Sequence, residues 1–264
     1  MSEQERPLLV ISDLSVTLRG RKVLNGLDLK ISDNEIVGFI GESGAGKTVT
    51  ALTILRLLPS NAILTSGQIR YRGRNLIELT ETEMRKLRGT EIGIVLQDPL
   101  TALNPVIRID KQLSEGMRIR LGYSRRLAME ESERLLSAVG ISNPQRCLQA
   151  YPHQLSGGMR QRILIASALS CKPRLLICDE ITSSVDSIVQ SQLLTLLKQL
   201  RNNLKLSILL ITHNLRAAHR VADRICVLLE GKVVEEGRTD EIFEKPAHAF
   251  TRSLVSSVSR LEKR

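Results

Sequence analysis

The residues Gly41–Thr48 read GESGAGKT and satisfy the phosphate-binding pattern G-x-x-x-x-G-K-[ST]. They follow the apolar run EIVGFIG and open a stretch of helical periodicity, which is the strand, loop and helix context that this motif needs. Backbone N–H groups from Ser43 onward can surround a phosphate, Lys47 adds a positive charge, and the Thr48 hydroxyl can bind magnesium. The candidate nucleotide-binding residues are Gly41, Glu42, Ser43, Gly44, Ala45, Gly46, Lys47 and Thr48.

Two acids follow a second apolar run, LLICDE, at residues 175–180. An aspartate at the end of a buried strand can enter the magnesium shell of a phosphate site, so Asp179 is predicted as a metal ligand. Glu180, one residue on, is placed to orient or deprotonate an attacking water. In isolation, two acids at a strand end more often form an ordinary solvated terminus; with a phosphate loop in the same chain, function is favoured.

The stretch LSGGMRQR at residues 155–162 opens another helical run. One reading is a capped helix, with Ser156 as the N-cap and with Arg160 and Arg162 on a solvated face. The other reading is an anion site, because Gly157 and Gly158 leave backbone N–H groups bare at a helix N-terminus.

Apolar runs between turn residues predict the strands that position these groups. Hairpins are expected from residues 8–18 with 22–31, turning at Gly20, and within 224–237, turning at Glu230 and Gly231. Residues 67–73 are expected as an edge strand, and the stretch ETEMRKLRG at residues 81–89 is expected as a short helix. Buried strands are expected at residues 35–41, 92–97, 175–180 and 207–213.

Helical patterns alternate with the later strands, around residues 157–171 and 187–203, which predicts a mostly parallel sheet with helices on both faces. Between Gln97 and Ser156 the strand signal disappears, and two amphipathic helices are expected, ending near Gly122 and Gly140. The expected fold is α/β, with an N-terminal antiparallel β element and an inserted helical lobe. The domain boundaries that we expect are a core at 1–97 and 157–240, a helical subdomain at 98–156 and a C-terminal segment at 241–264.

Composition limits the classes of function. The net charge is +10, yet aromatic residues are 2% and the bases are spread along the chain, so a nucleic-acid interface is not expected. The N-terminus MSEQERPLL has no apolar leader pattern, and no apolar run is long enough for a membrane span. The cysteines show no metal-ligand spacing and are expected to be reduced, mostly buried thiols: Cys147, Cys171, Cys178 and Cys226.

Taken together, GESGAGKT, LSGGMRQR, LLICDE and LLITH resemble the ATP-binding subunit of an ABC transporter, over most of the chain. The resemblance implies a P-loop NTPase fold of the RecA-like type that binds ATP and Mg²⁺ and hydrolyses ATP. It also implies that Ser156, Gly157 and Gly158 contact the nucleotide held by the phosphate loop of a second ATP-binding subunit.

The same resemblance assigns roles to three further positions. Gln97, after the strand IGIVLQ, matches the glutamine that senses magnesium and links to the helical lobe, and His213 matches the switch histidine at the γ-phosphate. In isolation, Gln97 would be an ordinary surface residue and His213 a satisfied core histidine. Asp186, in the stretch SSVD, resembles part of the loop that crosses the dimer interface.

Some residues depart from the family pattern. Ile181, Ser184 and Val185 replace the proline, alanine and leucine that are common after the glutamate. The position expected to stack on adenine falls at Leu18, which is not aromatic, so base contact is expected to come from apolar packing.

The segments VLQDPLTALNP and EIFEKPAHAFTRSLVSSV resemble the peptide/nickel importer subfamily, and the short ending favours nickel or metal-chelate import over dipeptide or oligopeptide import. The implied partners are a second, sibling ATPase subunit, two membrane permeases and, indirectly, an extracytoplasmic binding protein, at the cytoplasmic face of the inner membrane. Two alternatives are a DNA-repair type ATPase, which lacks support because no long coiled coil separates the motifs, and a regulatory subunit that hydrolyses little ATP.

Overall fold

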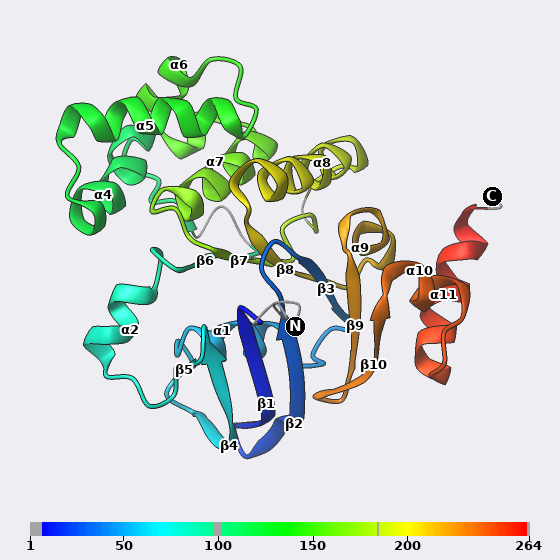
Figure 1. Ribbon diagram of the computed structural model, residues 1–264. Coiled ribbons are helices and arrows are strands. Elements are labelled where there is room, and N and C mark those ends of the chain that lie inside the picture. The colour runs from blue at the N-terminus through cyan, green and yellow to red at the C-terminus, as the bar shows by residue number, and fades with distance from the viewer. Residues whose placement is uncertain (1–6, 98–101, 184, 263–264) are drawn as a thin grey trace, which may run out of the picture. The chain divides into compact units, whose positions relative to one another are not determined.

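The computed structural model describes residues 7–97, 102–183 and 185–262, with side chains up to residue 257 (Figure 1). Ser184 therefore lies outside the described residues. Two compact units are present as far as they are described, one from residues 1–84 and 201–264 and the other from residues 85–200. Each unit is treated separately below.

The first unit contains an antiparallel sheet in the strand order β2-β1-β4-β5 (Figure 1). The predicted hairpin is confirmed, because β1 (Leu9–Leu18) pairs with β2 (Arg21–Ile31) around a tight turn at Arg19 and Gly20, both with positive φ. The expected edge strand was wrong in one respect. β4 (Ala62–Tyr71) lies between β1 and the two-residue β5 (Arg74–Asn75), so it is not at the edge.

The same unit contains three parallel strands, β3 (Ile36–Gly41), β8 (Ser207–Thr212) and β9 (Arg224–Leu229). β3 is the middle strand, and each of its residues is buried, as expected for a strand covered on both faces. β10 (Lys232–Arg238) pairs antiparallel with β9 through the predicted turn at Glu230 and Gly231. The register Ile40↔Thr212 brings the carboxyl ends of β3 and β8 to one edge.

Helices complete the first unit. α1 (Lys47–Ile54) follows β3 directly, and α9 (Leu215–Val221) follows β8. α10 (Thr239–Glu244) and α11 (Ala249–Glu262) follow β10, where Figure 1 shows them in orange and red. The sequence did not predict α9 or α10.

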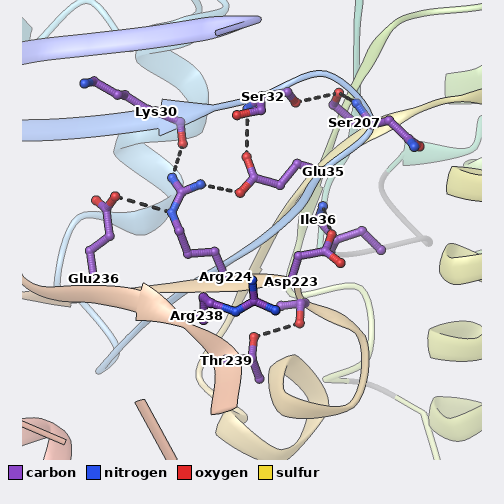
Figure 2. A network of polar contacts seen from close by, with 12 residues as sticks. Lys30, Ser32, Glu35, Ile36, Ser207, Asp223, Arg224, Glu236, Arg238 and Thr239 are labelled. Atoms are coloured by element: carbon purple, nitrogen blue, oxygen red, sulfur yellow. Dashed lines mark hydrogen bonds and ion pairs between the residues drawn. The ribbon is translucent and has the colours of Figure 1, made fainter. Parts of the chain in front are cut away.

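A polar network ties together the amino ends of the parallel strands (Figure 2). The Arg224 guanidinium pairs with Glu35, donates to the Lys30 carbonyl at 2.5 Å and lies 3.3 Å from Glu236. Burial alone would lower the pKa of Arg224, but nearby negative groups, Glu35 foremost, raise its pKa above the ordinary value. Arg224 thus joins β2, β9 and β10 at this edge.

Two further side chains close the same network (Figure 2). The Asp223 carboxylate accepts from the Ile36 N–H at 2.8 Å and pairs with Arg201 at 3.3 Å. The Ser207 hydroxyl donates to the Ser32 carbonyl at 3.0 Å and accepts from the Asn34 N–H at 2.8 Å. Loop backbone groups before β3 are therefore paired within the protein.

The second unit contains the parallel strands β6 (Ile92–Val95) and β7 (Leu175–Asp179). It also contains the helices that lie between these two strands in the sequence. The two amphipathic helices expected here are present as α4 (Ile109–Leu121) and α5 (Arg125–Ala138), and α4 ends at Gly122 in the left-handed conformation. They lie together in green in Figure 1. The remaining elements of this part are the unpredicted α6 (Pro144–Gln149), a 3₁₀ turn (Pro152–Gln154) and α7 (Gly157–Leu169).

Two helices cross the boundary between the units. α2 (Glu81–Leu87) matches the short helix that the sequence indicates before β6. α8 (Ser187–Leu204) runs from the second unit into the first and buries a leucine stripe, as its 3.6-residue period predicts. No helix among the described residues is long and apolar enough to cross a membrane.

Candidate nucleotide-binding site

The phosphate loop joins β3 to α1, as its sequence context predicts. Gly41 ends β3, and a Cβ on it would lie 2.5 Å from the Leu228 carbonyl oxygen. Gly46 caps α1 with φ 109°, and a Cβ there would lie 2.6 Å from a Leu24 methyl. Both glycines are needed so that the loop can pack closely on β2 and β9.

Lys47 is buried, with 6% of its surface exposed, although its ammonium group carries a charge. Its Nζ donates to the carbonyl oxygens of Gly41 at 2.8 Å and Glu42 at 2.9 Å, so the side chain folds back over the loop. These two bonds satisfy the buried ammonium group in part and hold it beside the loop backbone.

The other loop residues lie at the surface or are engaged within the loop. Glu42, Ser43, Gly44 and Thr48 are exposed. The Ala45 N–H donates to the Glu42 carbonyl at 3.2 Å, and the Ala45 carbonyl accepts from the Gly231 N–H at 3.2 Å. The β9–β10 turn is therefore hydrogen-bonded to the phosphate loop. The sequence did not predict this contact.

His213 leaves the carboxyl end of β8 in the first unit. Because Ile40 pairs with Thr212, the residues that follow them, Gly41 and His213, emerge at the same edge of the sheet. His213 is exposed, so the reading of a satisfied core histidine is wrong. Asn214 begins α9 by accepting from the Ala217 N–H at 3.1 Å, which fixes the backbone beside His213.

Leu18 lies at the end of β1, half-buried, opposite Arg21 on β2 and Ala62 on β4. The nearby β2 residue Leu24 contacts the phosphate loop at Gly46, so this end of the hairpin lies beside the loop. Of the aromatic side chains on the strands of this unit, Phe39 and Tyr71 are both buried. Leu18 is thus placed to meet a base through apolar contact.

In the second unit, Asp179 ends β7, and Glu180 follows it. Both are buried, with 2% and 8% of their surfaces exposed. Glu180 has φ 51°, a left-handed conformation that costs a non-glycine residue about 1–2 kcal/mol. Two buried acids at a strand end do not form the ordinary solvated terminus that was the alternative reading.

Gln97 and Ser183 are brought together in the second unit. Gln97 is exposed, two residues after β6, and its Nε2 lies 3.5 Å from the Ser183 hydroxyl. That hydroxyl donates to the Glu180 carbonyl at 2.8 Å. The sequence places Ser183 at the start of the stretch SSVD, but it does not show these contacts with Gln97 and Glu180.

The LSGG stretch begins α7 in the second unit. Ser156 is its N-cap, and the hydroxyl accepts from the Met159 N–H at 3.3 Å, which confirms the cap. A Cβ on Gly157 would meet open space, so none of the described residues requires that glycine. A Cβ on Gly158 would lie 3.1 Å from Val189, so Gly158 also allows α7 to approach α8.

Arg160 and Arg162 are half-buried, which contradicts the reading of a solvated face. Arg162 donates to the Val139 carbonyl at 2.6 Å and to the Gln192 amide oxygen at 2.9 Å. Through this one side chain, α7 is linked to the end of α5 and to α8.

Asp186 begins α8. Its carboxylate accepts from the N–H groups of Ile188 at 3.0 Å and Val189 at 2.9 Å, a cap near the positive end of the helix dipole. Asp186 thus has a structural task within the chain, beside the dimer role that the resemblance implies.

The residues present fit a nucleoside triphosphate with magnesium. The glycine cradle and Lys47 suit a polyphosphate, whereas the described residues hold no cluster of three His, Cys, Asp or Glu side chains that could bind a metal alone. The hydroxyl of Thr48 in the first unit and the carboxylate of Asp179 in the second are each a type of oxygen ligand that magnesium takes.

Comparison with known proteins decides the family. The ABC transporter profile matches residues 24–183, which is more than half of the 264 residues. This chain belongs to the ABC transporter ATP-binding family. As a member it is an ATPase, and its α/β P-loop fold is the one that the sequence predicted.

Relatives of this ABC ATPase cover nearly its whole length. A probable peptide ABC transporter ATP-binding protein, y4tR, of Sinorhizobium fredii is 41% identical over 95% of this chain and 76% of that protein. A putative peptide import ATP-binding protein of Brucella abortus is 40% identical over 99% of this chain and 80% of that protein. The glutathione import ATP-binding protein GsiA of Salmonella typhimurium is 40% identical over 97% of this chain, which spans only 43% of GsiA.

Solved ABC cassettes share the fold. The structure of cbiO1 from Clostridium perfringens, part of the ABC transporter complex cbiONQ, matches with TM-score 0.81 and 25% identity, over 98% of this chain and 100% of that one. The dimeric ATP-binding cassette MJ0796 bound to ADP and Pi matches with TM-score 0.77 and 24% identity, over 88% and 98% of the two chains.

The cysteines of this ABC ATPase lie in its interior. All four are buried free thiols, as predicted. Burial raises the pKa of Cys147 to about 11, and it also raises the pKa of Cys178, one residue before Asp179. These thiols stay protonated at neutral pH and do not act as nucleophiles.

Proposed function

We propose that this chain is the ATP-hydrolysing subunit of an ABC importer of the peptide/nickel subfamily. One observation carries the proposal: a glycine-bounded loop at the carboxyl end of β3 holds the buried ammonium group of Lys47 at 2.8 and 2.9 Å from loop carbonyls. That geometry presents a cation and helix N–H groups to a polyphosphate.

Each site residue has a proposed task. Loop N–H groups and Lys47 bind the phosphates, Glu180 takes a proton from the attacking water, and His213 contacts the γ-phosphate. Magnesium, when bound with the nucleotide, neutralises phosphate charge. The residues proposed to hold it are Thr48, Gln97 and Asp179.

The proposed assembly is a dimer of ATP-binding subunits. Ser156, Gly157, Gly158 and Asp186 would then face the partner's nucleotide; the open space beside Gly157 supports this, because none of the described residues fills it. We propose a sibling partner chain, a single nucleotide-binding domain with its helical subdomain at 98–156 facing two permeases, and a binding protein beyond them. The complex would lie at the cytoplasmic face of the inner membrane.

Peptides and nickel are both proposed substrates of the transporter. The relatives described above are named for peptide or glutathione import, and none of those three for nickel. Their names support peptide import at least as well as the nickel assignment. They lend no support to the DNA-repair alternative.

Hydrolysis is tested with the chain and its partner subunit. Glu180→Gln is expected to keep ATP affinity within about two-fold and to lower kcat on the order of 1000-fold, because the base is lost and the fold is kept. Unchanged kcat would remove Glu180 from its task. Ser156→Arg is expected to impair the partner's site, and Ser137→Arg, on an exposed part of α5, is the control.

The cargo is tested in cells that lack their own importers. Uptake of a labelled dipeptide, of glutathione and of nickel is compared between wild type and Glu180→Gln in the complete transporter. Whichever uptake disappears in the variant identifies the cargo, and loss of none contradicts an import role for these compounds.

A further inference from the structure

The turn that follows β7 holds Glu180 in an unusual backbone conformation. Its φ of 51° lies in the left-handed region, which residues with a Cβ seldom adopt without support from their surroundings. The next two residues, Ile181 and Thr182, are 1% and 6% exposed, so the turn is buried until it reaches the exposed Ser183. Something in the turn must therefore stabilise this conformation.

Ser183 supplies two bonds to the same carbonyl oxygen. The Ser183 N–H donates to the Glu180 carbonyl at 3.1 Å, and the Ser183 hydroxyl donates to it at 2.8 Å. The N–H alone would close a four-residue turn. The hydroxyl is therefore an addition to the turn, and it fixes the carbonyl from the side-chain direction.

The Ser183 hydroxyl also faces a second residue of the site. Gln97, from the end of the neighbouring strand β6, places its Nε2 at 3.5 Å from the Ser183 oxygen, the outer limit of a hydrogen bond. A hydroxyl can donate one bond and accept others at once, so it can join an amide donor to a carbonyl acceptor. The three groups form a chain from Gln97 through Ser183 to Glu180.

We propose that Ser183 is a positioning residue that couples the place of Gln97 to the backbone conformation of Glu180. Movement of Gln97 is transmitted through the shared hydroxyl to the carbonyl of the residue that bears the base. This inference rests on the proposed role of Glu180 and adds a device that sets when its carboxylate is in place.

The test uses the full chain assembled with its partner subunit. Ser183→Ala removes the hydroxyl and keeps the N–H bond, so kcat is expected to fall about 10-fold while KM for ATP stays within about two-fold. Ser183→Thr keeps a hydroxyl and is expected to recover at least about half of the wild-type kcat. Ser137→Ala is the matched control, since its hydroxyl also donates to a backbone carbonyl, that of Glu133 at 3.0 Å.

A double-mutant cycle with Gln97→Ala tests the coupling itself. If the hydroxyl acts through Gln97, adding Ser183→Ala to Gln97→Ala should lower kcat by less than about two-fold further. Fully additive effects, or a lower melting temperature with unchanged kcat, would overturn the inference. If Glu180→Gln hydrolysed ATP as fast as the wild type, the proposed function would be contradicted instead. The two failures are therefore distinguishable.

Discussion

At their amino ends, β3, β8 and β9 are tied together by the charged and polar network of Figure 2, whereas at their carboxyl ends β3 and β8 run into glycines, a buried lysine and an exposed histidine. In the first end the Arg224 guanidinium meets Glu35 and Glu236, so charge is balanced by charge. In the second, the Lys47 ammonium donates to the neutral carbonyls of Gly41 and Glu42 at 2.8 and 2.9 Å.

The difference separates two uses of the same strands. A carboxylate beside a cation stabilises the fold, while the loop carbonyls hold the Lys47 ammonium beside the loop that is proposed to bind phosphate. The carboxyl ends of parallel strands are also where ligands bind in open α/β sheets. The amino end is thus structural, and the carboxyl end is the proposed nucleotide site.

The largest expected effect comes from breaking the carboxyl end. Lys47→Ala removes the buried cation, so kcat/KM for ATP should fall on the order of 100-fold, about 2.7 kcal/mol of transition-state stabilisation. Steady-state ATPase assays measure this, with Lys198→Ala on the exposed face of α8 as the control. Equal losses in the two variants would contradict a specific role for the loop lysine.

Breaking the amino end should instead affect stability. Arg224→Ala leaves Glu35 and Glu236 without their shared cation, and the free energy of unfolding should fall by about 2 kcal/mol. Denaturant unfolding measures this loss, and ATP affinity of the folded protein should be unchanged. Arg70→Ala, whose partner Gln68 is at the surface, should be nearly neutral. A large loss of ATP affinity in Arg224→Ala would contradict the assignment of a purely structural role to the amino end.

A substitution at Leu18 sharpens the chemistry of the carboxyl end. Leu18→Tyr supplies an aromatic ring beside the phosphate loop, so the Kd for ATP should fall about five-fold, on the order of 1 kcal/mol of base stacking. Leu18→Ile is the control that keeps the aliphatic character. Competition binding with ATP and GTP reads the result, and no gain from tyrosine would place the base elsewhere.

The smallest expected effect concerns the pH dependence of a contact between β10 and the residues just before α11. Burial alone would raise the pKa of Glu235, but the nearby Thr251 hydroxyl and the N–H groups of Ala247 and His248, which donate to the carboxylate at 2.6 and 2.9 Å, outweigh it, and the pKa lies below the ordinary value. A lowered carboxyl pKa means that this stabilisation is present at neutral pH and is lost as the pH falls below about 4.

Amide exchange at Ala247 and His248, corrected for intrinsic pH dependence, should therefore stay constant from neutral pH down to the ordinary carboxyl pKa and accelerate below it. Glu235→Gln should show faster exchange already at neutral pH and little further change. Glu244→Gln, exposed on α10, is the control. Exchange in wild type that is indifferent to acid would show that the carboxylate does not hold α11.

Local patterns in the sequence predicted much of this molecule. Both hairpins, the buried strands and the helices α4, α5, α7 and α8 follow from periodicity and turn residues, and the phosphate loop follows from its motif. The Ser156 cap and the burial of the cysteines were also predictable from residue type.

What the sequence could not show are contacts between distant residues. Nothing local indicates that Arg162 reaches Val139 and Gln192, or that Gln97 meets Ser183, because such pairs depend on how helices and strands pack. The left-handed φ of Glu180 is equally unreadable, since glutamate carries no preference for it. These are long-range consequences of the fold.

The turn between β9 and β10 limits where this protein can be altered for practical use. Its Gly231 receives a bond from the Asn25 N–H and gives one to Ala45 in the phosphate loop, so a reporter or affinity tag inserted there would disturb nucleotide contact directly. The turn at Gly73 has open space around it and no such duty, which makes it the better place to graft a fluorescent probe.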